Sequence, residues 1–159
     1  MMKSIVPLLM LPAALSLLGC NRDDPAPQKD PSAKWEPKES DLSGTWKIDA
    51  KATIDLLSKD PSVKPNDMER AKKFFESPEA AEIEMRYGNG TMTSTNVPGR
   101  TEPIEGIWKV LSKDGNLWTM ETTERGKEPE RVLFTWIDRD HVSIVEEGKS
   151  DPVVLARTN

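Results

Sequence analysis

Most of the chain after residue 80 alternates between apolar and polar side chains, and this period of two predicts β-strands with one buried face. The alternation is cleanest from Ala81 to Tyr87, where every second residue is apolar and the residues between are charged. Turn-forming residues such as Gly88-Asn89-Gly90 separate the successive segments. Later strands are expected over residues 91–97, 102–111, 118–122, 132–136, 142–144 and 153–157.

One further strand and two helices are expected before residue 81. Leu42, Trp46 and Ile48 would share one face of a strand over residues 42–49. The apolar residues then take up helical spacing, which predicts a helix over residues 50–59, ending before Pro61. A second helix is expected to begin near Pro65 and to stop at Pro78.

The short connections between the later strands decide how they pair. They cannot cross over the sheet, so neighbouring strands must run antiparallel. An open sheet would leave two edges with unpaired backbone groups, whereas pairing the first strand with the last removes both. We therefore predict a mainly β domain, a small antiparallel up-and-down barrel of eight strands with two short helices between the first and second strands. The alternative is a strongly curved open sheet packed on the two helices.

The N-terminal residues have the pattern of an export signal. Lys3 precedes an uncharged apolar run from Ile5 to Leu18, which is shorter than the roughly 20 residues of a spanning helix and contains prolines. The run predicts a secretory signal peptide over residues 1–19. It ends in Leu17-Leu18-Gly19-Cys20, which resembles the lipobox of bacterial lipoproteins.

This resemblance implies that Cys20 is acylated, with palmitate as a typical chain, and that the peptide bond before it is cut. The protein would then be anchored in the cell envelope, at the periplasmic face of the outer membrane. Asn21 follows the cysteine and differs from the Asp that retains lipoproteins in the inner membrane of enteric bacteria. The alternative is an ordinary signal peptide followed by an accidental cysteine.

Residues 20–40 are expected to form a disordered linker, because proline and charged residues dominate them and few are apolar. In polyproline form such a linker could hold a domain up to roughly 60 Å from the membrane. The folded domain is expected over residues 41–159. Trp35 is unusual in this setting, and it would either pack on the domain surface or remain exposed.

Charge and cysteine content exclude several classes of protein. The chain has 22 basic and 27 acidic side chains, a net charge of −5, and no basic cluster that could neutralise a nucleic-acid backbone. An acidic surface also disfavours electrostatic docking on anionic lipid, so membrane attachment would depend on acyl chains. A single cysteine forms no intramolecular disulfide, so the hydrophobic core must hold the domain together.

Gly44-Thr45-Trp46 in the first strand and Arg157 in the last resemble the calycin superfamily, the lipocalins and fatty-acid-binding proteins. In that group a tryptophan from a Gly-x-Trp sequence packs across the barrel end against a basic residue near the chain terminus. The resemblance implies that Trp46 stacks with Arg157, an arrangement that stabilises by roughly 0.5–2 kcal/mol. It also implies a barrel that binds a small hydrophobic molecule.

Aromatic and methionine side chains expected to face inward could line such a pocket. An eight-stranded barrel is close to the size at which the interior either holds one ligand or is filled by side chains, so a filled barrel is the alternative. Polar groups for an amphiphile would come from Thr119, Thr122 and Arg157. The candidate ligand-binding residues are Trp46, Met85, Trp108, Met120, Phe134, Trp136 and Arg157.

No motif for catalysis, a cofactor or a metal is recognisable. The sequence lacks a Gly-x-Ser-x-Gly elbow and a His-Glu-x-x-His helix, and its only histidine, His141, lies in a predicted turn beside two aspartates. We therefore expect a membrane-anchored periplasmic lipoprotein that binds a small hydrophobic ligand and is not an enzyme. The alternative is a filled barrel that acts as a protein or cell-envelope interaction module. Its surface would include apolar residues opposite the main rows, namely Ile107, Leu111, Leu133 and Ile137.

Overall fold

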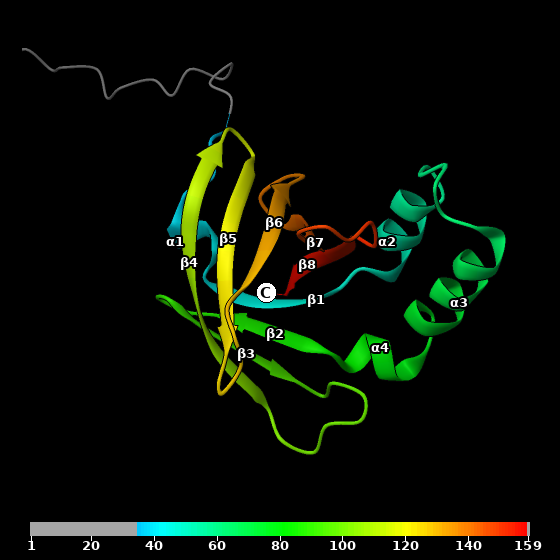
Figure 1. Cartoon of the computed structure of the whole chain (residues 1–159), viewed down its shortest axis with the longest axis horizontal. Helices are drawn as coiled ribbons and strands as arrows, with labels where there is room; N and C mark the ends of the chain where they lie inside the picture. Colours follow the sequence, from blue (N-terminus) through cyan, green and yellow to red (C-terminus); the bar gives the residue numbers. More distant parts are fainter. Residues whose placement is uncertain (1–34, 159) are drawn as a thin grey trace, which may run out of the picture. The chain divides into compact units, whose positions relative to one another are not determined.

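The computed structural model describes residues 35–158, and its core is a closed barrel of eight antiparallel strands (Figure 1). Each strand pairs with its neighbours in the sequence, and β1 pairs with β8, so the predicted up-and-down barrel is confirmed and the open-sheet alternative is wrong. The strands are β1 (Gly44–Ile48), β2 (Glu84–Tyr87), β3 (Thr91–Thr95), β4 (Ile104–Asp114), β5 (Leu117–Glu124), β6 (Glu130–Trp136), β7 (His141–Glu146) and β8 (Val153–Thr158).

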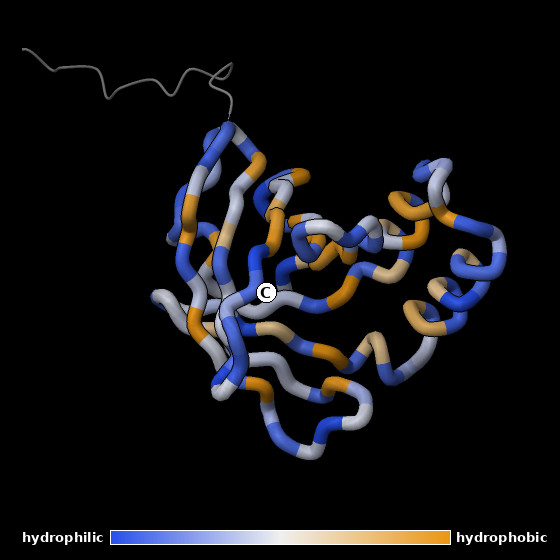
Figure 2. Tube along the Cα trace, viewed as in Figure 1, coloured by the Kyte–Doolittle hydropathy of each residue, from blue (hydrophilic) through white to orange (hydrophobic). Residues whose placement is uncertain are grey.

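The closing pair fixes the register of the barrel. Trp46 of β1 lies opposite Arg157 of β8, and Ile48 lies opposite Leu155. Because side chains alternate between faces along a strand, this register places Trp46, Ile48 and Leu155 in the interior. Apolar and polar residues alternate along the strands (Figure 2), as the sequence pattern predicts.

Helices lie at both ends of the barrel. The two helices expected between β1 and β2 are present, but a third follows them, because Pro78 begins a helix as well as ending one. Pro78 occupies the first turn of that helix, where its missing N–H costs nothing, and the Ser77 hydroxyl accepts the Ala80 N–H. The helices are α1 (Glu39–Leu42), α2 (Ala50–Leu57), α3 (Pro65–Phe75) and α4 (Pro78–Glu82).

Most strand boundaries differ from the prediction by one to three residues, and at two of them a helix takes residues expected in a strand. Leu42 belongs to α1, and Ala81 belongs to α4, although both continue the period-two pattern of the adjacent strand. Local capping decides these boundaries: the Lys38 N–H donates to Asp41, and Ser77 caps α4. No helix within residues 35–158 is long and apolar enough to cross a membrane.

Residues 35–40, expected from the sequence to lie in the linker, belong to the compact unit that begins at Trp35. Trp35 is half-buried and meets Trp136 edge to face, with ring centres 5.5 Å apart. The guanidinium carbon of Arg139 lies 6.0 Å from the Trp35 ring centre. Trp35 therefore packs on the domain, which is one of the two alternatives for this residue.

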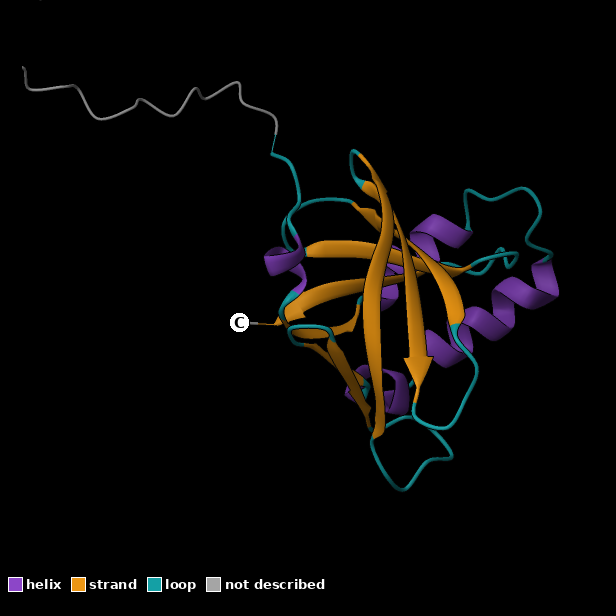
Figure 3. Ribbon diagram, turned by 60° about the vertical axis from the view of Figure 1, so that its left-hand side comes forward, coloured by secondary structure: helices purple, strands orange, loops and turns teal. Residues whose placement is uncertain are grey.

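The barrel has two different ends (Figures 1 and 3). α1 and the β2–β3, β4–β5 and β6–β7 turns lie at the end where β1 begins, which we call the closed end. α2, α3 and α4 lie at the end where β1 finishes, which we call the helical end. An up-and-down barrel places the β3–β4, β5–β6 and β7–β8 connections at the helical end as well.

Candidate ligand pocket

Tryptophan rings fill the closed end of the barrel. Trp136 lies at the centre of the group, because Trp46 and Trp118 meet it edge to face with ring centres 6.0 and 5.4 Å away. Neither Trp46 nor Trp118 exposes any surface to solvent. The Trp46 indole N–H donates to the Leu42 carbonyl over 2.9 Å, which ties α1 to the barrel interior. These buried rings pack against one another and fill this part of the barrel interior.

Arg157 covers this tryptophan group from the barrel end. Its guanidinium carbon lies 4.5 Å from the centre of the Trp46 ring, so the predicted stack is confirmed. The guanidinium also donates to the backbone carbonyls of Ser43 and Asp41, and its Nε lies 3.5 Å from a carboxylate oxygen of Asp140. Because these guanidinium donors already have partners within the protein, Arg157 helps to close this end of the barrel.

A pocket of about 420 Å³ opens at the helical end. This volume lies within the range of roughly 300–1,000 Å³ that is typical of small-molecule sites. Strand residues form its wall, and Phe74 and Phe75 of α3 form its helical side. Its apolar lining residues are Ile48, Phe74, Phe75, Ile83, Met85, Tyr87, Met92, Val97, Val132, Phe134, Ile144, Val153 and Leu155.

The size of the inward side chains explains why the barrel interior is open at this end. Along β6, the inward row runs from Trp136 at the closed end through Phe134 to Val132 at the helical end. Along β1 it runs from Trp46 to Ile48. On these two strands the inward side chains become smaller toward the helices, so the volume that tryptophan fills at one end is left open at the other.

The polar groups inside the pocket are uncharged. Ser94 and Thr122 line it with hydroxyl groups, and Thr122 lies beside Trp108 in the β4–β5 register. Tyr87 is also part of the lining, and burial raises the pKa of its hydroxyl, so this group stays protonated. The charged lining residues are Glu146, Lys149 and Asp151, near or within the β7–β8 connection.

The structure separates the predicted pocket residues into two groups. Met85 and Phe134 line the pocket. Met120 is fully buried, and Trp108 is nearly so, with its indole N–H donating to the Thr91 carbonyl over 2.9 Å. The predicted residues that do not line the pocket are Trp46, Trp108, Met120, Trp136 and Arg157.

The suggested polar contacts are separated in the same way. Thr122 lines the pocket, whereas Thr119 lies between the inward Trp118 and Met120 and therefore faces outward. The sequence pattern favours large aromatic residues as the lining and does not reveal the smaller inward residues at the opposite strand ends. A signal that could have found some of them is the decreasing side-chain size along inward rows such as Trp136, Phe134 and Val132. Missed lining residues include Ile48, Ser94, Val132, Ile144 and Val153.

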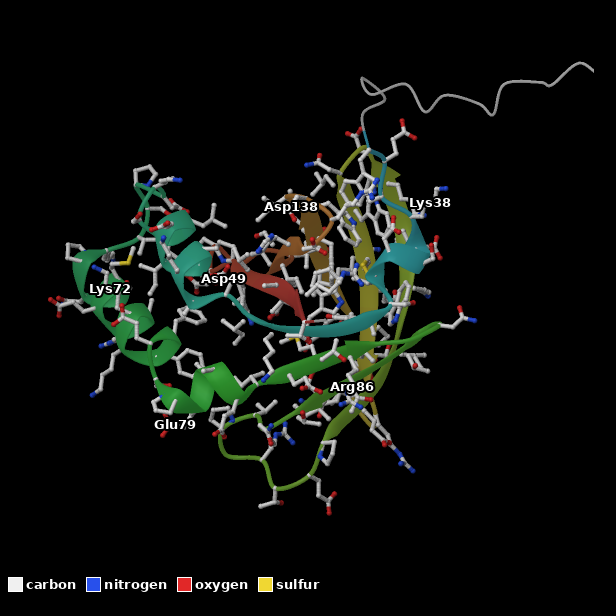
Figure 4. The ribbon with its side chains drawn as sticks, turned by 180° about the vertical axis from the view of Figure 1, so that it is seen from behind. Lys38, Asp49, Lys72, Glu79, Arg86 and Asp138 are labelled. Carbon is white, nitrogen blue, oxygen red and sulfur yellow. The ribbon has the colours of Figure 1, made fainter. Side chains whose placement is uncertain are left out.

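His141 connects a turn to a helix. Its Nδ1 lies 2.9 Å from Asp138, and its Nε2 lies 3.8 Å from Asp49, whose carboxylate caps α2 by accepting the Ala52 N–H. Figure 4 marks Asp49 at the start of α2 and Asp138 in the β6–β7 turn. Within residues 35–158 no group of three or more histidine, cysteine or acidic side chains is arranged to hold a metal ion.

Apolar residues on the outer face of the barrel were expected either to pack under the helices or to be exposed. Ile107 exposes 60% of its surface and Ile137 exposes 55%. Leu111 and Leu117 are exposed as well, while Leu133 is half-buried on the outer face of β6. The outer face of β4 to β6 therefore carries solvent-exposed apolar side chains.

Comparison with known proteins does not identify a relative. No family model matches this chain, and searches of curated proteins and of solved structures found no match either. Cys20 lies outside the described residues, so its acylation stays a prediction.

Proposed function

We propose that this domain binds a small apolar molecule in the pocket at the helical end of the barrel and performs no catalysis on it. The supporting observation is the pocket itself, which combines a volume of about 420 Å³ with a mainly apolar lining. Its far side is sealed by the tryptophan group and Arg157, so a ligand would enter past α3. Phe74, which belongs to the lining, is 42% exposed and would cover the entrance.

We further propose that the domain is lipocalin-like. Three features support this assignment: the closed eight-stranded barrel, the Trp46–Arg157 stack at one end and the helices between β1 and β2 at the other. The lipobox-like sequence before Cys20 supports a lipid anchor in the bacterial envelope, at the periplasmic face of the outer membrane. An anchored carrier of this kind would hold an apolar molecule near the membrane.

A displacement assay on the chain from residue 20 onward tests the binding proposal. None of the five tryptophans lines the pocket among the described residues, so an external reporter is needed. The uncharged dye N-phenyl-1-naphthylamine is expected to fluoresce in the pocket, and aliphatic compounds are expected to displace it and to raise the melting temperature.

A pocket-filling variant makes the assay specific. Val132→Phe adds volume on the inward face of β6 and is expected to weaken dye binding about tenfold or more, or roughly 1.4 kcal/mol. Leu133→Phe makes a similar enlargement on the outward face of the same strand and is the matched control. Equal dye binding by both variants, with both folded, would reject the pocket as the binding site.

The second candidate function is a protein-interaction module. The exposure of Ile107 and Ile137 supports it, because a partner protein could cover these apolar side chains. The two candidates make different predictions for the same assay. A module that does not use the pocket would show no displacement by any aliphatic compound and no change in melting temperature.

A further inference from the structure

We propose that the natural ligand of this pocket is an amphiphile without negative charge, in which an aliphatic chain lies inside the barrel and an uncharged or cationic head group lies at the mouth. This inference rests on the proposed binding function and specifies the class of ligand. It follows from the charges at the mouth of the pocket and from the uncharged groups inside it.

The mouth is acidic. Glu146 and Asp151 line it, and Lys149 is the only basic residue among its described lining residues. The Lys149 ammonium group donates a hydrogen bond to Glu146 and forms an ion pair with it, so its charge is already compensated. Two carboxylates and one ammonium group therefore leave a net negative charge among the charged lining residues.

The surroundings of Lys149 add to the excess of negative charge at the mouth. The hydrogen bond to Glu146 raises the pKa of Lys149, and desolvation lowers it by a smaller amount. The negative charges of Glu146, Glu130 and Asp151 raise this pKa further. Three carboxylates thus act on one ammonium group. The lysines near the end of α3, Lys72 and Lys73, are exposed and do not belong to the lining.

The interior offers no alternative site for an anionic head group. Its polar groups are the hydroxyls of Tyr87, Ser94 and Thr122, which donate and accept hydrogen bonds without carrying charge. Arg157 would be the natural partner of a carboxylate, but it lies at the closed end behind the tryptophan group and is bound to backbone carbonyls. A buried carboxylate without a partner would carry a large desolvation cost.

Ligands with one chain length and three head groups test this inference. Monolaurin, laurate and dodecyltrimethylammonium, each below its micelle concentration, would displace N-phenyl-1-naphthylamine from the wild-type protein. We expect monolaurin and dodecyltrimethylammonium to displace the dye at concentrations about tenfold or more below that of laurate at low salt, because carboxylates face the head group. Added salt is expected to narrow the difference.

Charge variants identify the residues responsible. Glu146→Gln combined with Asp151→Asn leaves Lys149 free to pair with a carboxylate. The readout is the concentration of laurate that displaces the dye divided by the concentration of monolaurin that does so. We expect the double variant to lower this ratio about tenfold. Glu147→Gln removes a neighbouring carboxylate that pairs with Arg131 and does not line the pocket, so the ratio is expected to stay as in the wild type.

The outcomes separate the two proposals. Displacement by laurate and monolaurin at equal concentrations, with no effect of the double variant, would overturn the head-group inference and leave the pocket proposal standing. Failure of all three compounds to displace the dye, or undiminished dye binding by Val132→Phe, would overturn the pocket proposal itself.

Discussion

Arg157 and Trp46 face each other across the seam where the barrel closes: they are paired in the β1–β8 register, and the guanidinium carbon lies 4.5 Å from the indole ring centre. The same guanidinium donates to the carbonyls of Ser43 and Asp41, just before β1. One side chain therefore joins the last strand, the first strand and the end of α1.

Arg157→Lys is expected to lower the free energy of unfolding by about 2 kcal/mol, because an ammonium group cannot reproduce the planar stack and the two carbonyl contacts together. Urea denaturation of the chain from residue 20 measures the change. Arg131→Lys is the control, since Arg131 is exposed and has only a 3.8 Å ion pair with Glu147. Equal stability of the two variants would contradict the proposed role of Arg157.

Gly44 makes room for this arginine. Its φ is +137°, and a Cβ at this position would lie 3.0 Å from Nη1 of Arg157. Gly44→Ala is therefore expected to cost about 1–3 kcal/mol of stability. Gly99→Ala is the matched comparison, because Gly99 also has a positive φ, but a Cβ there would meet no atom within 4 Å. The penalty at Gly44 should exceed that at Gly99, and the reverse order would show that contact with Arg157 is unimportant.

Thr53 attaches α2 to the barrel. Its hydroxyl is fully buried, accepts the Val154 N–H over 2.9 Å and lies 3.5 Å from the Val154 carbonyl. Thr53→Val keeps the shape but leaves a buried donor unpaired, so a loss of about 1–3 kcal/mol is expected in urea denaturation. Thr93→Val, on the outer face of β3, is expected to have little effect. A neutral Thr53→Val variant would mean that α2 is held by packing alone.

Trp35 extends the folded unit beyond α1. Trp35→Ala removes its edge-to-face contact with Trp136 and is expected to reduce stability by about 1–2 kcal/mol. Glu36→Ala changes the exposed neighbouring residue and should leave the unfolding midpoint within error. If the two substitutions have the same effect, the contact of Trp35 with Trp136 does not stabilise the domain.

Acylation of Cys20 is tested by metabolic labelling in a bacterial host. The full-length protein is expected to incorporate radiolabelled palmitate and to fractionate with membranes, whereas Cys20→Ala should do neither, because several acyl chains are needed for stable attachment. Ser16→Ala, in the same apolar run, should keep the label. Equal labelling of the wild type and Cys20→Ala would exclude the lipid anchor at this cysteine.

The period-two pattern is sufficient to predict the eight strands, their antiparallel order and the closure of β1 on β8. It works because alternation decides which face of a strand is buried, and because short connections leave few ways to pair the strands. The resemblance around Gly44-Thr45-Trp46 also predicts the contact with Arg157. The pattern misses α4 as a whole, because the cap at Ser77 outweighs an alternation that continues through Ala81.

Only the tertiary structure decided where the barrel is filled and where it is hollow. Alternation shows that Trp46 and Val132 both face inward, but it does not show at which height along the barrel axis each one lies. That height depends on the register of the strands and on their tilt in the closed sheet, which arise from the pairing of distant segments. Register brings the tryptophans together at one end and leaves the small residues around the pocket at the other.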